Sequence, residues 1–369
     1  MPDRVIVVGA GITGSFAALD MALRGADVVL VEEGGSPRGA TASIAGVIHG
    51  GARFAVTAPM AAAVCRDENP LMLRIARDFI ISDRGYFLVA DWTQEDYIHK
   101  FESSTKELGI YARPVEPPVI DSIRPGILRS AFETSDAVID LQEFTAHLIW
   151  RAVAEGVEYS NSSRVTSARY LGDHEWELSV RRRSSERVLR GALIIAAGHG
   201  IPVFMRDVLG IDARGLGVAR GSHAVLKTHV PAVLQVLGAP GIGDLFAPAR
   251  GMTLVGPTLV PGGRPGAISD EERSSLIAAA SRVMNISKDD VIGWSSTGRL
   301  TFDAGISASP PDLVAEIHGA VVAYSANMTC GRRTAEAASD MVAGWLGLGR
   351  GNTRDIVVER EGPIVEAAL

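Results

Sequence analysis

Cysteine is scarce in this chain of 369 residues, which has only Cys65 and Cys330. Two thiols so far apart in the sequence indicate neither a disulfide framework nor a metal-ligand spacing. No metal site is therefore expected, and a reducing cytoplasm is the predicted location. No apolar run approaches the ~18 residues of a membrane helix, and the opening strand leaves no room for a signal peptide. A peripheral membrane contact stays open.

Positive charge is also in short supply, because the chain carries a formal net charge of −7. Nucleic-acid binding depends on clustered lysine and arginine, so nucleic acid is excluded as an expected partner. The one basic run, RRRSSER at 181–187, is short and indicates a solvated turn between strands. Glycine, in contrast, is abundant at 40 residues, which is typical of tight turns and close backbone approaches to a ligand.

The N-terminal segment predicts a strand, a turn, a helix and a second strand. VIVV at 5–8 is a continuous β-branched run suited to a buried parallel strand. Apolar residues at helical spacing follow from Phe16 to Leu23, and Gly25 indicates the helix end. A further strand, VVLVEE, occupies 28–33. This order is typical of a nucleotide-binding α/β unit.

Gly9, Gly11 and Gly14 form a G-x-G-x-x-G pattern between the first strand and the helix. The first glycine permits the turn, the second lets a pyrophosphate approach the backbone, and the third lets the helix pack on the strand. The pyrophosphate would lie at the helix N-terminus, where free N–H groups favour negative charge. Glu32 lies near the ~20-residue spacing of the acid that binds a ribose 2′-hydroxyl, which disfavours NADP.

The rest of the chain alternates less regularly. Helices are predicted at 60–82, 101–109, 142–155, 270–285 and 330–346. Prolines in VEPPVIDSIRPGI predict a connecting segment at 113–126. Short strands with turns are predicted at 157–195 and 215–261. Strands and helices recur without a clear boundary, which suggests two domains that share the chain discontinuously.

The surroundings of the glycine pattern favour FAD over NAD. LIIAAGHG at 193–200 has the pattern of a strand that returns to the cofactor site late in flavoproteins, and Gly198 would allow close approach. Nicotinamide dehydrogenases more often continue with regular alternation of strands and helices. The mixed stretch 157–261 interrupts such an alternation. The predicted cofactor is therefore FAD.

These residues resemble the FAD-dependent glycerol-3-phosphate dehydrogenases, within the wider D-amino-acid-oxidase-like flavoproteins. The similarity runs through VIVVGAGITGS, ALRGADVVLVEE and ATASIAGVIHGGARFAV, then through ENPLMLRIAR, IIAAGHG, RGSHAVL, LVGPTL and GWSSTGRL, over most of residues 4–346. It implies an α/β fold with a Rossmann-like FAD-binding domain and a substrate domain on a mostly antiparallel sheet. The implied division is an FAD-binding domain at 1–80, 136–214 and 306–350, a substrate domain at 81–135 and 215–305, and a C-terminal tail at 351–369.

The resemblance also implies a cofactor site, residue by residue. The three glycines and Glu32 would hold the ADP half of FAD, while Thr41 and Ser43 would lie near the pyrophosphate or the flavin. The segment from Asn327 through Met328 to Thr329 would lie near the flavin ring at a helix N-terminus, which stabilises negative charge on the reduced ring. The implied cofactor-binding residues are Gly9, Gly11, Gly14, Glu32, Thr41, Ser43, Gly198, Asn327, Met328 and Thr329.

The stretch VIHGGARF, at 47–54, combines two glycines with a fixed positive charge. The resemblance implies that this segment passes over the flavin, with Arg53 directed at an anionic substrate. Arg299, in STGRL, would be the second such arginine. His223 would be the general base, because oxidising a carbinol releases a hydroxyl proton and imidazole titrates near neutral pH. His49 is a second candidate.

Two positions depart from the family pattern. Ala326 and Asn327 stand where the family has Gly-Gly-Lys, and Phe54 stands where it usually has tyrosine. Both departures remove polar contacts to a phosphate. They favour a hydroxy acid, an amino acid, or a modified phosphorylated or phosphonylated alcohol as substrate. Arg332 or Arg333 could take the place of the missing lysine.

The predicted function is therefore that of an FAD-dependent dehydrogenase or oxidase that oxidises a carbinol carbon of a small anionic substrate by hydride transfer to the flavin. Electrons would then pass to a quinone, a carrier protein or oxygen. Two alternatives stay open. One is an amine or amino-acid oxidase on the same scaffold, and the other is a flavin-bound protein whose catalysis has lapsed.

Overall fold

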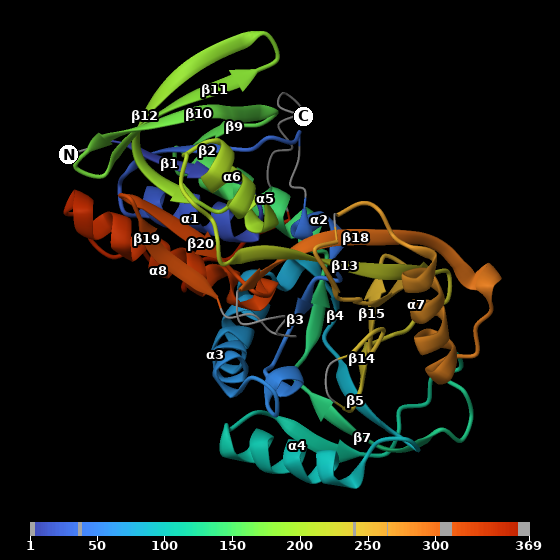
Figure 1. The fold of residues 1–369 in the computed structure, drawn as a ribbon. Coiled ribbons are helices and arrows are strands. Elements are labelled where there is room, and N and C mark those ends of the chain that lie inside the picture. Colours follow the sequence, from blue (N-terminus) through green and yellow to red (C-terminus); the bar gives the residue numbers. More distant parts are fainter. Residues whose placement is uncertain (1–3, 36–38, 239–240, 264, 303–311, 361–369) are drawn as a thin grey trace.

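The structure, a computed structural model, describes residues 4–35, 39–238, 241–263, 265–302 and 312–360. In these ranges the strands form an eight-stranded sheet, a nine-stranded sheet and a small three-stranded sheet, with helices packed around them (Figure 1). This arrangement confirms the predicted α/β class. None of the helices in the same ranges has the length and apolar character needed to cross a bilayer.

The eight-stranded sheet contains the predicted nucleotide-binding unit. Its strands are β1 (Arg4–Val8), β2 (Asp27–Val31), β9 (Glu158–Ser160), β10 (Ser163–Gly172), β11 (Glu175–Arg182), β12 (Ser185–Ile195), β19 (Leu313–Ile317) and β20 (Ala320–Tyr324). The neighbours β2, β1, β12 and β20 pair in parallel. The basic run at 181–187 covers the end of β11, the turn at 183–184 and the start of β12, so it contains the predicted turn between strands.

Both faces of the parallel strands are covered, which explains their continuous apolar sequences. Val5 and Val7 pack with helices α1 (Ile12–Leu23), α5 (Leu141–Ala154) and α8 (Gly331–Leu346) on one face. Ile6 and Val8 pack on the other face with Trp176 and other side chains of the antiparallel strands β10, β11 and β12. Figure 1 shows α1 and α8 on one side of this sheet and the projecting β10–β12 hairpins on the other.

The nine-stranded sheet forms the second half of the molecule. Its strands are β5 (Gly85–Ala90), β6 (Ala112–Val115), β7 (Leu128–Thr134), β13 (Leu216–Leu226), β14 (Val233–Val236), β15 (Leu245–Ala249), β16 (Met252–Gly256), β17 (Val260–Pro261) and β18 (Val291–Phe302). Within the described ranges its strand pairs are antiparallel apart from the parallel pair β14–β5, and they include the long β13–β18 pair. This sheet confirms the predicted mostly antiparallel character.

The small sheet and the remaining helices connect these two layers. The small sheet consists of β3 (Val47–Ile48), β4 (Ile80–Ser82) and β8 (Ala137–Ile139). The remaining helices are α2 (Ala40–Ser43), α3 (Pro59–Ile75), α4 (Glu95–Glu107), α6 (Ile201–Asp207) and α7 (Asp270–Val283). Short 3-10 turns lie at Ala52–Phe54, Arg77–Phe79, Gly198–Gly200, Lys288–Asp290 and Met328–Cys330.

The strands of each large sheet fall within one of the two predicted parts of the chain. Those of the eight-stranded sheet lie in 1–80, 136–214 and 306–350, and those of the nine-stranded sheet lie in 81–135 and 215–305. The division into two domains stays a prediction that this partition supports. Its boundary at 306 and the tail residues 361–369 lie outside the described residues.

The helix predicted at 60–82 is wrong at its C-terminal end. Helix α3 ends at Ile75, and the chain then forms a 3-10 turn and the strand β4. The apolar residues Ile80 and Ile81 continue the helical pattern of the sequence, but the backbone here pairs with β8. Tertiary pairing therefore overrides the local periodicity.

The segment around 95–126 also differs from the prediction. Helix α4 begins at Glu95 and not at 101, and Glu95 and Asp96 place acidic groups in its first turn, where the helix dipole favours them. The predicted connecting segment at 113–126 begins inside β6, which pairs with β7 despite Pro114. Proline is compatible with a strand at the sheet edge, where β6 lies.

Candidate active site

A cavity of about 1740 Å³ is lined by residues of both large sheets. The carboxyl ends of β1 and β2 border it at Val8 and Val31, and β13 and β18 border it from the other half. Open α/β sheets commonly bind their ligands beyond the carboxyl ends of parallel strands. The predicted site residues that line it are Gly9, Gly11, Glu32, Thr41, His49, Arg53, Gly198, His223, Arg299, Asn327 and Met328.

The glycine turn has no room for a side chain at Gly9 or at Gly14. Gly9 has φ +101°, and a Cβ there would lie 2.6 Å from the carbonyl oxygen of Ala196. A Cβ at Gly14 would lie 1.8 Å from the carbonyl oxygen of Gly9, so Gly14 allows α1 to pack on the turn although it lies outside the described cavity lining. Gly11 occupies the N-cap position of α1 and borders the cavity with bare backbone. This cradle fits a pyrophosphate at a helix N-terminus.

Glu32 is held rigidly just beyond β2. Its Oε2 accepts a hydrogen bond of 2.8 Å from the Ala10 N–H, and its Oε1 accepts one of 2.7 Å from the Gly34 N–H. The carboxylate also lines the cavity. Its position at the end of the second parallel strand is the one expected for an acid that binds ribose hydroxyls.

Of the predicted cofactor residues Thr41, Ser43 and Gly198, two line the cavity and Ser43 does not. Thr41 lines the cavity, and its hydroxyl accepts a hydrogen bond from the Ile12 N–H at 3.2 Å. Gly198 also lines the cavity. Ser43 lies outside the described lining, and its carbonyl oxygen accepts a 2.7 Å hydrogen bond from the Ser295 hydroxyl, which ties α2 to β18. Its contact with a cofactor stays a prediction without support from this geometry.

The segment 327–330 leads directly into α8. The Asn327 side chain accepts a hydrogen bond from the Cys330 N–H, and Asn327 and Met328 line the cavity. Thr329 lies outside the described lining, where its hydroxyl accepts a 2.9 Å hydrogen bond from the His49 N–H. The expected helix N-terminus is therefore present beside the cavity, and Thr329 ties it to the segment that carries Arg53.

The glycines of HGGARF are explained by packing. A Cβ at Gly50 would lie 2.1 Å from the Ser135 hydroxyl oxygen, and one at Gly51 would lie 2.5 Å from the Ala62 carbonyl oxygen on α3. Neither glycine is among the described residues that line the cavity, whereas Arg53 is. The close approach that requires glycine here is thus to α3 and to Ser135, and it fixes the turn that presents Arg53.

Arg53 is held by two side chains, Gln235 of β14 and Asp244 just before β15. Its guanidinium donates a 2.8 Å hydrogen bond to the Gln235 side-chain oxygen and forms a 2.9 Å ion pair with Asp244. The Gln235 amide then donates to the buried carboxylate of Asp136 at 2.7 Å. This network sets the position of Arg53 and offsets part of its charge.

The same network reaches His49. The carboxylate of Asp136 accepts a 2.6 Å hydrogen bond from the Gly50 N–H and lies 3.8 Å from His49 Nδ1. The His49 ring packs edge-on against Phe54, with ring centroids 5.2 Å apart. His49 thus lies on the cavity wall with a carboxylate behind it.

His223 and Arg299 come from the paired strands β13 and β18. The His223 side chain is buried, it borders the cavity, and its Nδ1 has no hydrogen-bond partner among the described residues. Burial, together with the nearby Arg299 guanidinium, lowers the pKa of His223 to about 4. Burial also lowers the pKa of Arg299, with a smaller effect from Arg53. The site therefore combines a neutral imidazole with two converging guanidinium groups.

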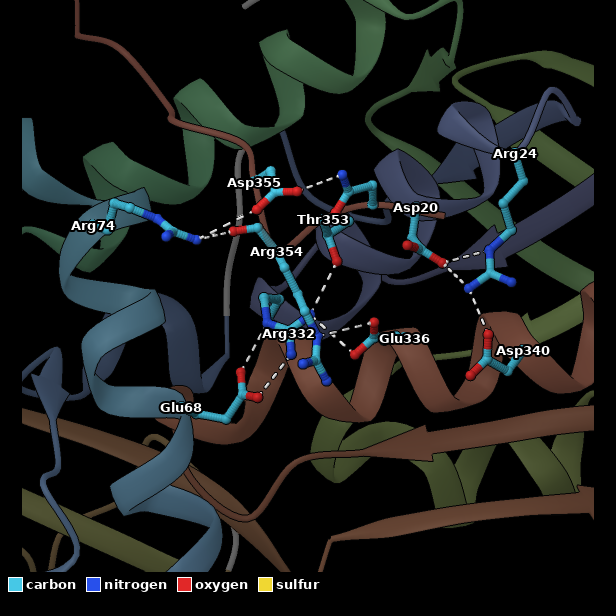
Figure 2. Close-up of polar contacts among 11 residues, drawn as sticks. Asp20, Arg24, Glu68, Arg74, Arg332, Glu336, Asp340, Thr353, Arg354 and Asp355 are labelled. Carbon is cyan, nitrogen blue, oxygen red and sulfur yellow. Dashed lines mark hydrogen bonds and ion pairs between the residues drawn. The ribbon is translucent and has the colours of Figure 1, made fainter. Parts of the chain in front are cut away.

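The two arginines considered as substitutes for the missing lysine have separate places. Figure 2 shows Arg332 between Glu68 on α3, Glu336 on its own helix and Thr353. Its side chain is fully buried and is not among the described cavity-lining residues. Arg333, in contrast, is exposed and lines the cavity. Of the two, only Arg333 is placed to meet a substrate.

Several site residues were missed by the sequence analysis. They are Asp136, Gln235, Asp244, His199 and Tyr324. His199 and Tyr324 line the cavity, and burial lowers the pKa of His199. Only Gln235 had a recognisable sequence pattern, because it is a polar residue among the apolar residues of β14. The structure shows that its side chain is fully buried. Among the described residues, no group of three or more His, Cys, Asp or Glu side chains is placed to hold a metal ion.

Comparison with known proteins defines the class. The sequence profile of the FAD dependent oxidoreductase family (DAO) matches residues 4–341, and the chain belongs to this family. The family's dependence on FAD confirms the predicted cofactor. The glycine cradle, the carboxylate of Glu32 and the size of the cavity fit such a group.

Within this class, the chain is similar to glycerol-3-phosphate dehydrogenases. It is 27% identical over 260 residues to an anaerobic glycerol-3-phosphate dehydrogenase subunit from Escherichia coli K12, a match that covers 69% of this chain and 48% of the relative. It is 31% identical over 269 residues to an anaerobic glycerol-3-phosphate dehydrogenase subunit from Haloferax volcanii, covering 69% of this chain and 46% of the relative. The chain thus spans about half the length of these curated relatives.

Solved structures agree with the fold. Glycine oxidase from Geobacillus kaustophilus superposes with a TM-score of 0.77 at 16% identity, covering 97% of this chain and 99% of the other. L-α-glycerophosphate oxidase from Mycoplasma pneumoniae, solved with FAD bound, superposes with a TM-score of 0.76 at 15% identity, covering 95% and 96%. At this identity the likeness establishes the fold and not the substrate.

We expect Gly11→Ala to weaken FAD binding roughly tenfold, about 1.4 kcal/mol, while the fold is kept. The added Cβ would lie 3.2 Å from the Thr41 hydroxyl, a side chain that can adjust, but it would occupy the approach to the pyrophosphate. Flavin absorbance per chain and the far-ultraviolet circular dichroism spectrum measure the two effects. Gly344→Ala is the control, because its Cβ would have no neighbour within 4 Å among the described residues. Unchanged FAD affinity in Gly11→Ala would contradict the assignment.

Proposed function

We propose that this chain is an FAD-dependent dehydrogenase or oxidase that oxidises a carbon bearing a hydroxyl group in a small anionic substrate. The observation that supports this most is the convergence of Arg53, Arg299 and the neutral His223 on one cavity with the glycine turn. Two cations suit an anion, and an unprotonated imidazole suits the removal of a hydroxyl proton. FAD, when bound, supplies the acceptor for the hydride.

Three groups of described residues would each bind a different part of FAD. The turn at Gly9 and Gly11 would hold the pyrophosphate at the N-terminus of α1, and Glu32 would bind ribose hydroxyls. The segment that leads into α8, at Asn327 and Met328, would face the flavin ring. Its helix dipole would favour the negative charge of the reduced ring.

The two arginines would capture the anion. Burial disfavours the charged form of Arg299, so its guanidinium is stabilised when a negative group meets it in the cavity. Arg53 is already oriented by Gln235 and Asp244, which lowers the conformational cost of binding. A forked guanidinium suits the planar carboxylate and the phosphate equally well.

His223 would take the hydroxyl proton. Its low pKa keeps the ring unprotonated at neutral pH, and its Nδ1 is not engaged by a described residue. An anion bound beside Arg299 would offset the positive charge that depresses this pKa. Substrate binding would therefore raise the pKa of His223, so that the ring becomes a stronger base in the complex that reacts.

The lining favours a carboxylate or a small phosphorylated group. Phe54 and Asn327 line the cavity where the family resemblance implies tyrosine and lysine, and no lysine is present among the described lining residues. Arg333 at the rim supplies a further cation. We therefore propose short 2-hydroxy acids as the leading class, with glycerol 3-phosphate, the substrate in the name of the curated relatives, beside them.

We expect Arg53→Ala to weaken substrate capture roughly 10- to 150-fold, because a charge-assisted contact of about 1.5–3 kcal/mol is lost. The variant also leaves the Asp244 carboxylate unpaired beside the cavity, which repels an anion. Asp244→Asn is the matched variant. It keeps the shape of the pair, removes one negative charge, and should tighten anion binding. Flavin difference spectra during titration measure both affinities, and equal affinities in both variants and the wild type would contradict the role of Arg53.

The amino-acid oxidase alternative receives support from the same arginines, which would bind an amino-acid carboxylate. Turnover with an artificial electron acceptor separates the two functions. The proposed function predicts a ketone or aldehyde product from a hydroxylated anion without release of ammonia. Ammonia release from amino acids, with no reaction of hydroxylated anions, would overturn it in favour of the oxidase. The natural acceptor remains proposed as a quinone, a carrier protein or oxygen, and the location as the cytoplasm, with peripheral membrane contact still open.

A further inference from the structure

The two cysteines of the chain lie against each other at the cavity wall. Cys65 is on α3 and Cys330 ends the 3-10 turn before α8, yet their Sγ atoms are only 3.7 Å apart. Both side chains are buried, both are free thiols, and Cys330 lines the cavity. Their distance in the sequence gave no indication of this contact. The two sulfur atoms are already in van der Waals contact, and forming a disulfide bond would bring them to about 2.05 Å from each other.

The surroundings of this pair are polar on the side of Cys330. The Asn327 amide nitrogen lies 3.4 Å from the Cys330 Sγ and 3.6 Å from the Cys65 Sγ. The Asp312 carboxylate lines the same cavity, accepts a 2.8 Å hydrogen bond from the Ala326 N–H, and acts on the Cys330 thiol through its negative charge. The thiol pair thus has an amide donor for a sulfur anion and a carboxylate that can accept a proton.

The Cys330 thiol needs a base, and the Asp312 carboxylate is placed to act as one. The contact with the Cys65 thiol, together with burial, raises the pKa of Cys330, so the resting thiol is protonated. Burial also raises the pKa of Asp312, which makes its carboxylate a stronger proton acceptor than an ordinary aspartate. A thiolate, and not a thiol, is the reactive nucleophile.

We propose that Cys65 and Cys330 form a reversible oxidation site for small hydroperoxides, hydrogen peroxide included, that enter through the cavity. The Asp312 carboxylate takes the proton of the Cys330 thiol, and the sulfur attacks one peroxide oxygen. An S–O bond forms, the O–O bond breaks, and the leaving oxygen takes the proton from Asp312 to give an alcohol or water.

The second step joins the two cysteines. The Cys65 Sγ attacks the sulfenic sulfur of Cys330, so the S–S bond forms, the S–O bond breaks, and hydroxide leaves with the Cys65 proton as water. In total, two thiols lose two electrons and one peroxide gains them. An external dithiol reverses the step by exchange. The disulfide would link α3 to the start of α8 and so fix the segment of Asn327.

This site does not depend on the proposed substrate, because the oxidant can be added directly. A flavoenzyme that uses oxygen as its acceptor also releases peroxide, which would place the oxidant in this cavity. The contact of the two thiols, the neighbouring carboxylate and the opening to the cavity carry the inference.

The test counts thiols in the flavin-loaded full chain. The reduced protein is treated with one equivalent of hydrogen peroxide, denatured in an alkylating reagent, and weighed intact. Because the chain has only two cysteines, the oxidised protein should take no alkyl group, weigh two hydrogen atoms less than the reduced chain, and recover both sites after dithiothreitol. Two alkylated thiols after peroxide, a disulfide-linked dimer, or added oxygen without a cross-link would each overturn the proposal.

Three variants test the order of events. Cys65→Ser should stop at a sulfenic acid on Cys330 that a dimedone probe traps, and Cys330→Ser should leave Cys65 reduced. Asp312→Asn should slow thiol loss roughly tenfold or more, because the proton acceptor is removed. Thiol loss at the wild-type rate in Asp312→Asn or in Cys330→Ser would overturn the assigned roles. Each readout is a mass or a thiol count and does not require turnover of substrate.

Discussion

His223→Gln should slow reduction of the bound flavin by substrate at least ~100-fold, the lower end of the contribution of a general base. Glutamine keeps a polar side chain of similar reach at this buried position of β13, but it cannot accept the hydroxyl proton. FAD should remain bound, because His223 is remote in sequence and role from the glycine turn. Anaerobic stopped-flow absorbance measures the rate constant directly.

The matched control is His229→Gln. His229 is exposed, a few residues beyond the end of β13, and does not appear in the cavity lining that the described residues form. It should reduce flavin at the wild-type rate. If His223→Gln also keeps the wild-type rate, His223 is a buried structural histidine, and the proton has another acceptor, for which His49 on the cavity wall is the next candidate.

The pH dependence of turnover should also show that His223 is the base. A base with a pKa of about 4 in the free protein is unprotonated above that value. The kcat/KM should therefore stay level as the pH falls through the usual histidine range near 6.5 and decline only toward about 4. The decline of kcat should begin at a higher pH than the decline of kcat/KM, because the bound anion offsets the positive charge of Arg299 that lowers the pKa of His223. A limb that persists unchanged in His223→Gln would assign it to a different group.

Glu68→Gln should lower the free energy of unfolding by about 3–5 kcal/mol, the usual cost of breaking a buried ion pair from one side. Arg332 is fully buried, and two of its nitrogens donate to Glu68 at 2.8 and 2.7 Å (Figure 2). Glutamine offers one neutral oxygen in place of the two carboxylate oxygens, so among the described residues the guanidinium keeps only the 3.1 Å ion pair with Glu336 as charge compensation. The urea-unfolding midpoint of the flavin-loaded chain measures the loss.

Asp355→Asn provides the control from the same cluster in Figure 2. Asp355 forms an exposed pair with Arg74 at 3.9 Å, and exposed pairs contribute about 0–1 kcal/mol. Its midpoint should match the wild type. Equal midpoints for Glu68→Gln and the wild type would show that Arg332 is solvated or has other partners in solution.

The sequence predicted the nucleotide-binding unit because its constraints are local. Gly9 and Gly14 are required by contacts within one turn, and the VIVV run is apolar because both its faces are covered. The end of α3 could not be predicted in the same way. Ile80 continues an apolar pattern that suits either a helix or a strand, and only its pairing with β8 decides between them.

Sequence motifs predicted those site residues that lie within a recognisable stretch of the chain. They did not predict the side chains that bind to these residues from distant parts of the chain. Arg53 and His223 were found through the resemblance, and the structure brings both to one cavity. The Asp244 carboxylate that pairs with Arg53 lies in another part of the chain, and no sequence spacing links the two. The contact between Cys65 and Cys330 arises in the same way, from the packing of α3 against the 3-10 turn Met328–Cys330 that precedes α8.

The proposed function requires that this cavity binds FAD and that the bound flavin takes a hydride from a hydroxylated anion. An anaerobic absorbance titration of the purified full chain tests both requirements together, with glycerol 3-phosphate, short 2-hydroxy acids, amino acids and simple phosphonates as the panel. We expect a flavin spectrum that a hydroxylated anion bleaches at one equivalent per flavin. Bleaching by amino acids alone, or a flavin band that no member of the panel bleaches, would contradict the proposed function.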